Sequence, residues 1–373
     1  MARAVLLSLI LIPFGVAFLL FRNQVPQSKP INTLVSSPKE ILPEGTEVIQ
    51  VVATNLRIPW EIAFLPNGDM LFTEREGLLR IKTADGQIKT IATIEEVNEI
   101  GEGGLLGIAL HPKFASQNFL YLYYTYKSSG ENTLNRVVRY TLNGITLGEK
   151  AIIVDSIPGS SNHNGGRIKF GPDGFLYITT GDAQNPSLAQ KKNSLAGKIL
   201  RVSDDGTIPT DNPFPNSPVY SYGHRNPQGL AWDDKGQLWA TEHGSSAFDE
   251  VNLILPGKNY GWPEIRGSES REGLETPFLH SGTSTWAPSG ATTISDSLFF
   301  SGLRGSAIFE LNLKTKNLKK HFENQFGRIR AIALGPDGFF YILTNNRDGR
   351  GNPTAEDDRI IKIHPSLFGV TLD

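Results

Sequence analysis

The sequence predicts an all-β protein, a six-bladed β-propeller with an N-terminal hydrophobic segment that serves as a membrane anchor or export signal. The first observation behind this prediction is a strand–turn–strand pattern that occurs six times along the chain. The second is the content of 38 Gly and 23 Pro in 373 residues, which is typical of many short strands joined by turns. The third is that residues 45–373 lack a sustained 3.6-residue apolar period long enough for a core helix.

Each repeat contains a short apolar strand, a turn at Pro/Asp/Asn-x-Gly and a second strand rich in Tyr, Phe, Leu or Trp. A further strand follows most of the repeats, as at residues 78–86, 198–206 and 359–366. About four strands in each of six units is the signature of a propeller, whereas a β-sandwich would not need the turn at the same place in every unit. The six copies occupy residues 58–75, 105–125, 165–182, 227–244, 291–311 and 328–346.

The N-terminal part of the chain predicts export. Residues 4–21 form an uncharged apolar run between Arg3 and Arg22, and a Pro/Ser/Gln-rich stretch follows. We therefore divide the chain into a signal peptide or membrane anchor (1–22), a flexible tether (23–44) and an exported propeller domain (45–373). An uncleaved anchor is favoured over a cleaved signal, because no small-x-small site precedes Arg22.

Composition excludes several classes of function. The 36 Lys and Arg against 38 Asp and Glu leave a formal net charge of −2, whereas a nucleic-acid partner would normally require a basic excess. The sequence contains no cysteine, which excludes a thiolate zinc site, an iron–sulfur cluster and a cysteine nucleophile. We expect membrane contact through the N-terminal segment only.

Unusual loop residues indicate a site at one face of the propeller, where the innermost strands converge. His163 stands directly before a Gly-Gly and an inner strand, where its imidazole could face the channel mouth. Four arginines at equivalent blade positions would form a cationic funnel suited to a small polyanion bound through carboxylates. These arginines are Arg225, Arg304, Arg328 and Arg330.

Four segments carry a resemblance to a known family: HNGGRIKFGPDGFLYITTGD, YGHRNPQGLAWD, DEVNLILPGKNYGWP and GRIRAIALGPDGFFYILT. They resemble the soluble, pyrroloquinoline-quinone (PQQ)-dependent glucose and aldose sugar dehydrogenases, the glucose/sorbosone dehydrogenase family. The resemblance covers about residues 48–365. It implies a PQQ- and Ca²⁺-dependent oxidation of aldose sugars at the anomeric carbon to the lactone, with His163 as general base. The base would take the hydroxyl proton while a hydride leaves for the quinone.

The resemblance also implies roles for other residues. Arg225 and Asn226 would contact the quinone, Arg328 and Arg330 would hold its carboxylates, and Arg304 stands where the family often has a lysine.

The implied Ca²⁺ ligands are the backbone carbonyls of Gly244 and Ser245 in EHGSS. Asp249, Glu250 and Tyr260 would supply a second, structural Ca²⁺ site or else a cluster that caps strand ends.

Glu102 replaces a glutamine that some members place beside the substrate, and we group Asn162 with it as a substrate residue. The sugar and its electron acceptor stay open. Two alternatives also stay open: an exported six-bladed propeller lactonase, which would need side-chain carboxylates on a channel metal, and a non-catalytic propeller that binds carbohydrate or protein.

Overall fold

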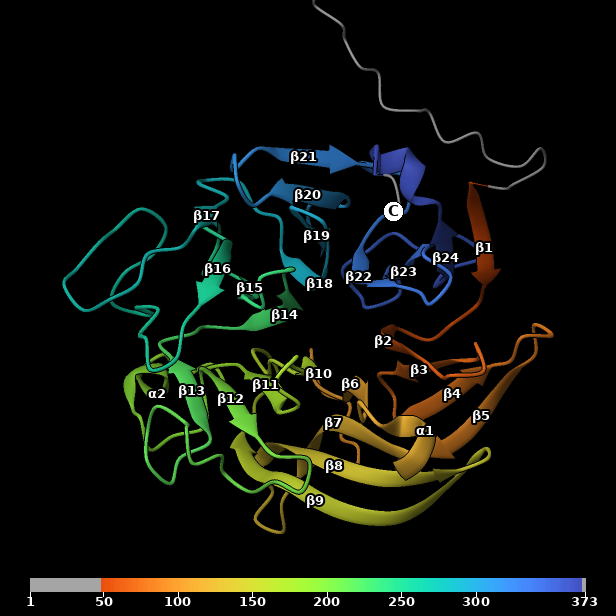
Figure 1. Cartoon of the computed structure of the whole chain (residues 1–373), viewed down its shortest axis with the longest axis horizontal. Coiled ribbons are helices and arrows are strands. Elements are labelled where there is room, and N and C mark those ends of the chain that lie inside the picture. The colour runs from red at the N-terminus through yellow and green to blue at the C-terminus, as the bar shows by residue number, and fades with distance from the viewer. Residues whose placement is uncertain (1–47, 371–373) are drawn as a thin grey trace, which may run out of the picture. The chain divides into compact units, whose positions relative to one another are not determined.

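The computed structural model describes residues 48–370, which fold as six four-stranded antiparallel sheets around a central axis (Figure 1). The predicted all-β, six-bladed propeller is therefore confirmed. The predicted signal or anchor (1–22) and tether (23–44) lie outside the described residues. Within residues 48–370, no helix has the length and apolar character needed to cross a bilayer.

The strands of each blade follow one another along the chain, from the innermost strand near the axis to the outermost. The first three blades are β2 (Pro59–Phe64), β3 (Met70–Glu74), β4 (Leu78–Lys82) and β5 (Ile88–Thr93); β6 (Leu105–Leu110), β7 (Phe119–Lys127), β8 (Thr133–Asn143) and β9 (Thr146–Pro158); and β10 (Ile168–Phe170), β11 (Leu176–Thr180), β12 (Lys198–Val202) and β13 (Val219–Tyr222). The next two are β14 (Pro227–Trp232), β15 (Leu238–Glu242), β16 (Glu250–Ile254) and β17 (Leu279–His280); and β18 (Pro288–Ile294), β19 (Ser297–Gly302), β20 (Ile308–Asn312) and β21 (Leu318–His321).

The last blade joins the two ends of the propeller. Its inner strands are β22 (Ile329–Leu334), β23 (Phe340–Thr344) and β24 (Ile360–Ile363), and its outermost strand is β1 (Ile49–Ala53) from the other end of the domain. β1 runs antiparallel to β24, with Ile49 opposite Ile363 and Val51 opposite Ile361. This pairing closes the ring, and the repeat pattern in the sequence did not reveal it.

The repeated turn has a structural purpose that recurs in three blades. In the Pro-Asp-Gly turns, Asp173 accepts a hydrogen bond from the hydroxyl of Tyr177 at 2.9 Å, and Asp337 accepts one from Tyr341 at 2.8 Å. Asp233 accepts one from the Trp239 indole at 3.0 Å. Each turn carboxylate thus fixes the aromatic side chain at the second position of the following strand, which explains the Asp and aromatic positions of the repeat.

Helices contribute little to the described fold. The three segments are α1 (Phe114–Gln117), α2 (Ser187–Gln190) and the 3₁₀ turn η1 (Pro365–Phe368). The core lies between the faces of neighbouring sheets, where Tyr121 and Tyr123 of β7 belong to the same buried cluster as Ile168 and Ile178 of the next blade. Every sheet is covered on both faces in this way, so the strands hold the inner loops at fixed positions.

Ring closure predicts a measurable loss of stability on removing β1. A chain that starts at residue 55 should have a lower free energy of unfolding than one that starts at residue 45, by about 3–5 kcal/mol, because β24 loses its backbone hydrogen-bond partners. Urea unfolding of both chains measures the difference. Equal unfolding midpoints would show that the contacts between β1 and β24 do not stabilise the ring.

Candidate functional site

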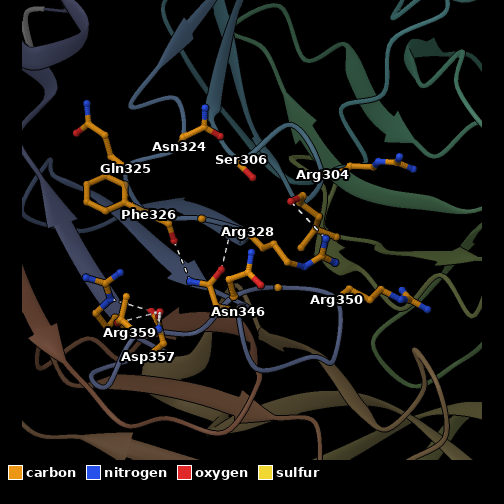
Figure 2. A pocket seen from close by; sticks show the side chains of 15 residues that line it. Arg304, Ser306, Asn324, Gln325, Phe326, Arg328, Asn346, Arg350, Asp357 and Arg359 are labelled. Atoms are coloured by element: carbon orange, nitrogen blue, oxygen red, sulfur yellow. Dashed lines mark hydrogen bonds and ion pairs between the residues drawn. The ribbon is translucent and has the colours of Figure 1, made fainter.

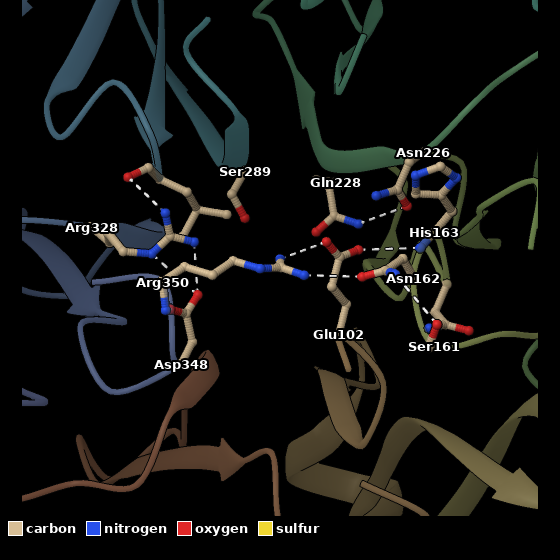
Figure 3. Close-up of polar contacts among 12 residues, drawn as sticks. Glu102, Ser161, Asn162, His163, Asn226, Gln228, Ser289, Arg328, Asp348 and Arg350 are labelled. Atoms are coloured by element: carbon tan, nitrogen blue, oxygen red, sulfur yellow. Dashed lines mark hydrogen bonds and ion pairs between the residues drawn. The ribbon is translucent and has the colours of Figure 1, made fainter. Parts of the chain in front are cut away.

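The candidate residues come together at the face of the propeller where the inner strands begin. Glu102 precedes β6, His163 precedes β10, Asn226 precedes β14 and Arg328 precedes β22. Figure 3 shows these side chains converging on one region although they come from four different blades. The structure therefore gathers the general-base, quinone and substrate candidates of the sequence at one end of the central channel.

His163 forms the best-defined pair in this region. Its Nδ1 donates to Oδ1 of Asp182 at 2.7 Å, so the neutral ring keeps the lone pair on Nε2. Asp182 is fully buried and follows β11 of the same blade, and its Oδ2 accepts the Trp262 indole N–H at 2.8 Å. A histidine whose second nitrogen is held by a buried carboxylate has the arrangement of an oriented general base.

Two candidate quinone residues, Arg225 and Asn226, are held by the blade that follows His163. The Arg225 guanidinium lies 5.4 Å from the Trp262 ring centre, and burial lowers the pKa of Arg225. Asn226 is 1% exposed, and its Oδ1 accepts hydrogen bonds from the Gly165 backbone N–H and from Gln228. The amide nitrogen of Asn226 consequently remains available as a donor.

Arg330 and Arg328 differ in their surroundings. Arg330 lies on the inner strand β22 and is 5% exposed, and it donates to Oε1 of Gln228 at 2.9 Å. Burial lowers the pKa of Arg330 to about 10, which leaves the side chain charged at neutral pH. Arg328 instead donates twice to Oδ2 of Asp348, at 2.7 and 3.2 Å, so its charge is already partnered.

Arg304 occupies a different blade position. It lies between β19 and β20, whereas Arg225 and Arg328 precede inner strands and Arg330 lies on one. The sequence pattern suggested that the four arginines occupy equivalent blade positions, and the structure shows that they do not. Arg304 is exposed and lines a cavity of about 380 Å³ together with Arg328 and Arg350 (Figure 2). Of the four arginines, only Arg304 and Arg328 line this cavity, whereas Arg225 lines a smaller one.

The donor set of the channel fits a polycarboxylate. Among the candidate quinone residues, three buried nitrogens have no hydrogen-bond partner within the described part of the chain: Nε of Arg225, Nδ2 of Asn226 and Nε of Arg330. Leaving a buried donor unpaired costs roughly 1–3 kcal/mol, so such donors are usually satisfied by a ligand or water. A ligand with several carboxylates would satisfy all three.

The calcium candidates also meet in space. Gly244, Ser245, Glu250 and Tyr260 all line one small cavity of about 20 Å³. Burial, together with the neighbouring Glu242, raises the pKa of Glu250 to about 8. A bound cation would offset the electrostatic cost of burying the Glu250 carboxylate near Glu242. Within residues 48–370, no group of three or more His, Asp or Glu side chains could hold a metal, so backbone oxygens would be needed there.

Asp249 and the Tyr260 hydroxyl are engaged elsewhere. Asp249 accepts the backbone N–H of Gly244 at 2.9 Å and those of Trp286 and Ala287 at 2.6 and 2.8 Å. It therefore caps strand ends and fastens the EHGSS loop to the next blade. The Tyr260 hydroxyl donates to the Leu253 carbonyl at 2.6 Å, which leaves only the Tyr260 backbone oxygen for a metal.

The substrate candidates share a partner from the last blade. Arg350 donates to Oε1 of Glu102 at 2.7 Å and to Oδ1 of Asn162 at 3.0 Å, so it bridges them across the channel (Figure 3). Burial opposes ionisation of Glu102, but nearby positive charge, from His243 and Arg350, outweighs it and lowers the pKa of Glu102 to about 2. Burial lowers the pKa of His243 to about 4, so His243 is charged only in the acidic range where Glu102 titrates. At neutral pH, Arg350 is the charged partner.

Sequence reasoning missed two members of this site. Asp182 is the last residue of the repeat at 165–182, and its position just after the second strand could have marked it as a partner for His163. Arg350 lies 248 residues from Glu102 in a loop without a repeat pattern, so only the folded ring brings the two together.

Comparison with known proteins agrees with this geometry. Residues 56–356 match the family described as Glucose / Sorbosone dehydrogenase. The chain is 31% identical over 344 residues to an aldose sugar dehydrogenase of Escherichia coli, covering 82% of this chain and 92% of the relative. It is 36% identical over 257 residues to quinoprotein glucose dehydrogenase B of Acinetobacter calcoaceticus, covering 60% and 54%.

A solved structure shares the whole architecture. The PQQ-bound form of an aldose sugar dehydrogenase from Streptomyces coelicolor superposes with a TM-score of 0.80 at 42% identity, covering 85% of this chain and 96% of that structure. The family match spans far more than half of the sequence, and the ring of six blades is common to both proteins. This chain therefore belongs to the glucose/sorbosone dehydrogenase family of sugar-oxidising enzymes.

Proposed function

We propose that this chain oxidises aldose sugars at the anomeric carbon to lactones, with PQQ as hydride acceptor, Ca²⁺ as Lewis acid and His163 as general base. The observation that carries the proposal is the His163–Asp182 pair beside buried arginine and amide donors that lack partners. The quinoprotein and PQQ-bound relatives support the same cofactor.

The cofactor would lie among the unpaired donors. Arg225, Asn226 and Arg330 would hold its carboxylates and ring oxygens, with Arg328 and Arg304 at the rim of the adjoining cavity. Bound PQQ supplies an electrophilic quinone carbonyl that accepts the hydride. The surrounding guanidinium groups would balance its negative charge in a channel where water screens charge poorly.

His163 would remove the proton of the anomeric hydroxyl through Nε2. The Asp182 carboxylate holds Nδ1–H, fixes the orientation of the ring and stabilises the imidazolium once the proton has arrived. The indole of Trp262 and the Gln184 backbone N–H in turn hold Asp182, at 2.8 Å each. Asp182 is in this sense a positioning residue for the base.

Calcium would bind beside the quinone site. The backbone oxygens of Gly244 and Ser245, with Glu250 and the Tyr260 carbonyl near the same small cavity, are the oxygen ligands that Ca²⁺ takes. A bound cation would also favour the ionised form of Glu250.

The sugar would meet Glu102 and Asn162, whose carboxylate and amide can bind hydroxyl groups. Arg350 already occupies one oxygen of each, so a sugar must either bind beside Arg350 or displace it. The lactonase alternative receives less support, because it needs a set of side-chain carboxylates that residues 48–370 do not assemble. A non-catalytic propeller would not require a half-buried His163 paired with the buried Asp182 carboxylate.

We also propose that the enzyme is exported and works outside the plasma membrane, anchored by residues 4–21. Electrons from the sugar would then pass to an acceptor on the membrane. The nature of that acceptor stays open.

Replacing the base should abolish catalysis while sparing cofactor binding. We expect His163→Ala to lower turnover about 10²- to 10⁴-fold with saturating PQQ, and Asp182→Asn to lower it at least about tenfold. The PQQ concentration that gives half-saturation should stay nearly unchanged in both variants. Steady-state dye-linked sugar oxidation measures the turnover, and His321→Ala, on the outer strand β21, is the control. A loss below fivefold for His163→Ala would remove it from this role.

The channel arginines should determine cofactor affinity. We expect Arg330→Ala to weaken PQQ binding roughly 10- to 100-fold, because a buried charged hydrogen bond is lost. Arg328→Ala should also weaken binding, since it removes a cation and leaves the buried Asp348 carboxylate without its partner. Titration of the apoenzyme with PQQ measures both, with Arg271→Ala on the surface as the matched control. Unchanged half-saturation in both variants would place the quinone elsewhere.

The anchor proposal predicts the mass and location of the mature protein. We expect natively expressed protein to retain residues 4–21 and to fractionate with the membrane, because no small-x-small site precedes Arg22. Intact-mass measurement and fractionation test this. A soluble species starting between residues 20 and 40 would show a cleaved signal instead.

A further inference from the structure

The central channel has a second chamber at the end opposite the candidate site. A cavity of about 490 Å³ is lined by residues from all six inner strands, which approach it with their later residues, such as Phe64, Leu110, Phe170 and Leu334. The site residues described above precede or begin these same strands. We call this chamber the far mouth, since the inner strands separate it from the sugar and quinone residues.

A plug of stacked side chains separates the two ends. The ring of Trp60, 1% exposed, lies 4.1 Å from the Arg167 guanidinium carbon and 5.6 Å from that of Arg330. Arg330 belongs to the quinone side, whereas Arg167 lines the far mouth. A small molecule in the far mouth would consequently contact Arg167 without entering the quinone site.

The far mouth carries an excess of positive charge. Its charged lining residues are Glu61, Arg167 and Lys169, and the single carboxylate of Glu61 forms an ion pair with Arg167. Lys169 is two positions after Arg167 and shares its face of the strand. The only hydrogen bond of the half-buried Lys169 ammonium among the described residues goes to the Leu230 carbonyl at 3.4 Å. No acidic side chain of the lining is left to balance Lys169.

Arg167 also has an unmet donor. It is 3% exposed, its Nε donates to the Gln228 carbonyl at 2.8 Å, and its Nη2 has no hydrogen-bond partner among the described residues. Burial, with a smaller contribution from Arg167, lowers the pKa of Lys169 to about 8, which is the effect expected of a cation without a counter-charge. In the part of the chain that the structure describes, Lys169 therefore lacks an anion, and Arg167, although paired with Glu61, keeps an unmet donor beside it.

The rest of the lining is largely apolar and firmly packed. Phe170, one position after Lys169, turns its ring to the opposite face of β10, where it makes edge contacts with His111 and Tyr121 at ring-centre distances of 5.5 and 5.1 Å. Leu334 is 37% exposed at the rim. This combination of an apolar lining and an unbalanced cation favours an organic anion over a bare inorganic one.

We propose that the far mouth is a binding site for a small monocarboxylate that carries an apolar ring or short chain. The carboxylate accepts hydrogen bonds from Lys169 and from Nη2 of Arg167, and the apolar part packs against the apolar lining at the rim, including Leu334. Charge-assisted bonds of this kind are the strong ones in proteins. The site is separate from the proposed sugar and quinone site and does not depend on that proposal.

Benzoate tests the site, with neutral benzamide of nearly the same shape as the comparison ligand. Calorimetric titration of the full chain should show benzoate binding, with benzamide and inorganic phosphate each at least about tenfold weaker. Added PQQ should not compete with benzoate, because the plug separates the two chambers. Absence of benzoate binding at millimolar concentration, or competition by PQQ, would overturn the proposal.

Two variants locate the ligand independently. Lys169→Met should weaken benzoate binding at least about tenfold. Leu334→Glu places a carboxylate at the rim and should weaken it as well, whereas Leu367→Glu in η1, at a matched 38% exposure, should leave it unchanged. Thermal unfolding of each variant shows that the fold is retained. Benzoate binding unaffected by both Lys169→Met and Leu334→Glu would place the anion at the quinone arginines and refute the site.

Discussion

Closure of the ring is the constraint on which the rest of this structure depends. Each blade is an antiparallel sheet of consecutive strands, but the last blade is complete only when β1 pairs with β24. Closure fixes the six inner strands around one axis, and the loops before them then meet at one end. Contacts between residues far apart in sequence follow from it: Arg350 donates to Glu102, and Arg330 donates to Gln228. A sheet with free ends would hold neither pair at hydrogen-bond distance.

The channel concentrates buried cations that the fold itself does not neutralise. Arg225 and Arg330 have donors without partners, and burial lowers the pKa of both groups. The fold moderates this cost by placing guanidinium groups over tryptophan rings, as with Arg225 on Trp262 and Arg167 on Trp60. Such unpaired charge lowers stability and is retained where a ligand supplies the missing partners. The net charge of −2 conceals this local excess, because acidic residues elsewhere on the chain balance it.

Gln228 connects the two ends of the channel. Its backbone carbonyl accepts from Arg167, its side-chain oxygen accepts from Arg330, and its amide nitrogen donates to Asn226 at 3.1 Å. One residue of β14 thus holds residues of the proposed quinone site through its side chain and Arg167 of the far mouth through its backbone carbonyl. The Trp60 ring between the two arginines completes the partition, so the chambers are neighbours that share a wall.

The sequence by itself determined the all-β class and the six blades, because the turn and strand pattern is local. It also named most residues of the candidate site, because the His163 and Arg225 motifs lie beside inner strands. For Asp249 the sequence left a calcium site and a strand-end cap open, and the structure shows the contacts of a cap. Tertiary structure alone decided that β1 closes the ring and that Arg350 spans the channel to Glu102. The physical reason is that these contacts join segments that are far apart along the chain and that no local sequence pattern relates. Only packing of the blades around a common axis sets their distances.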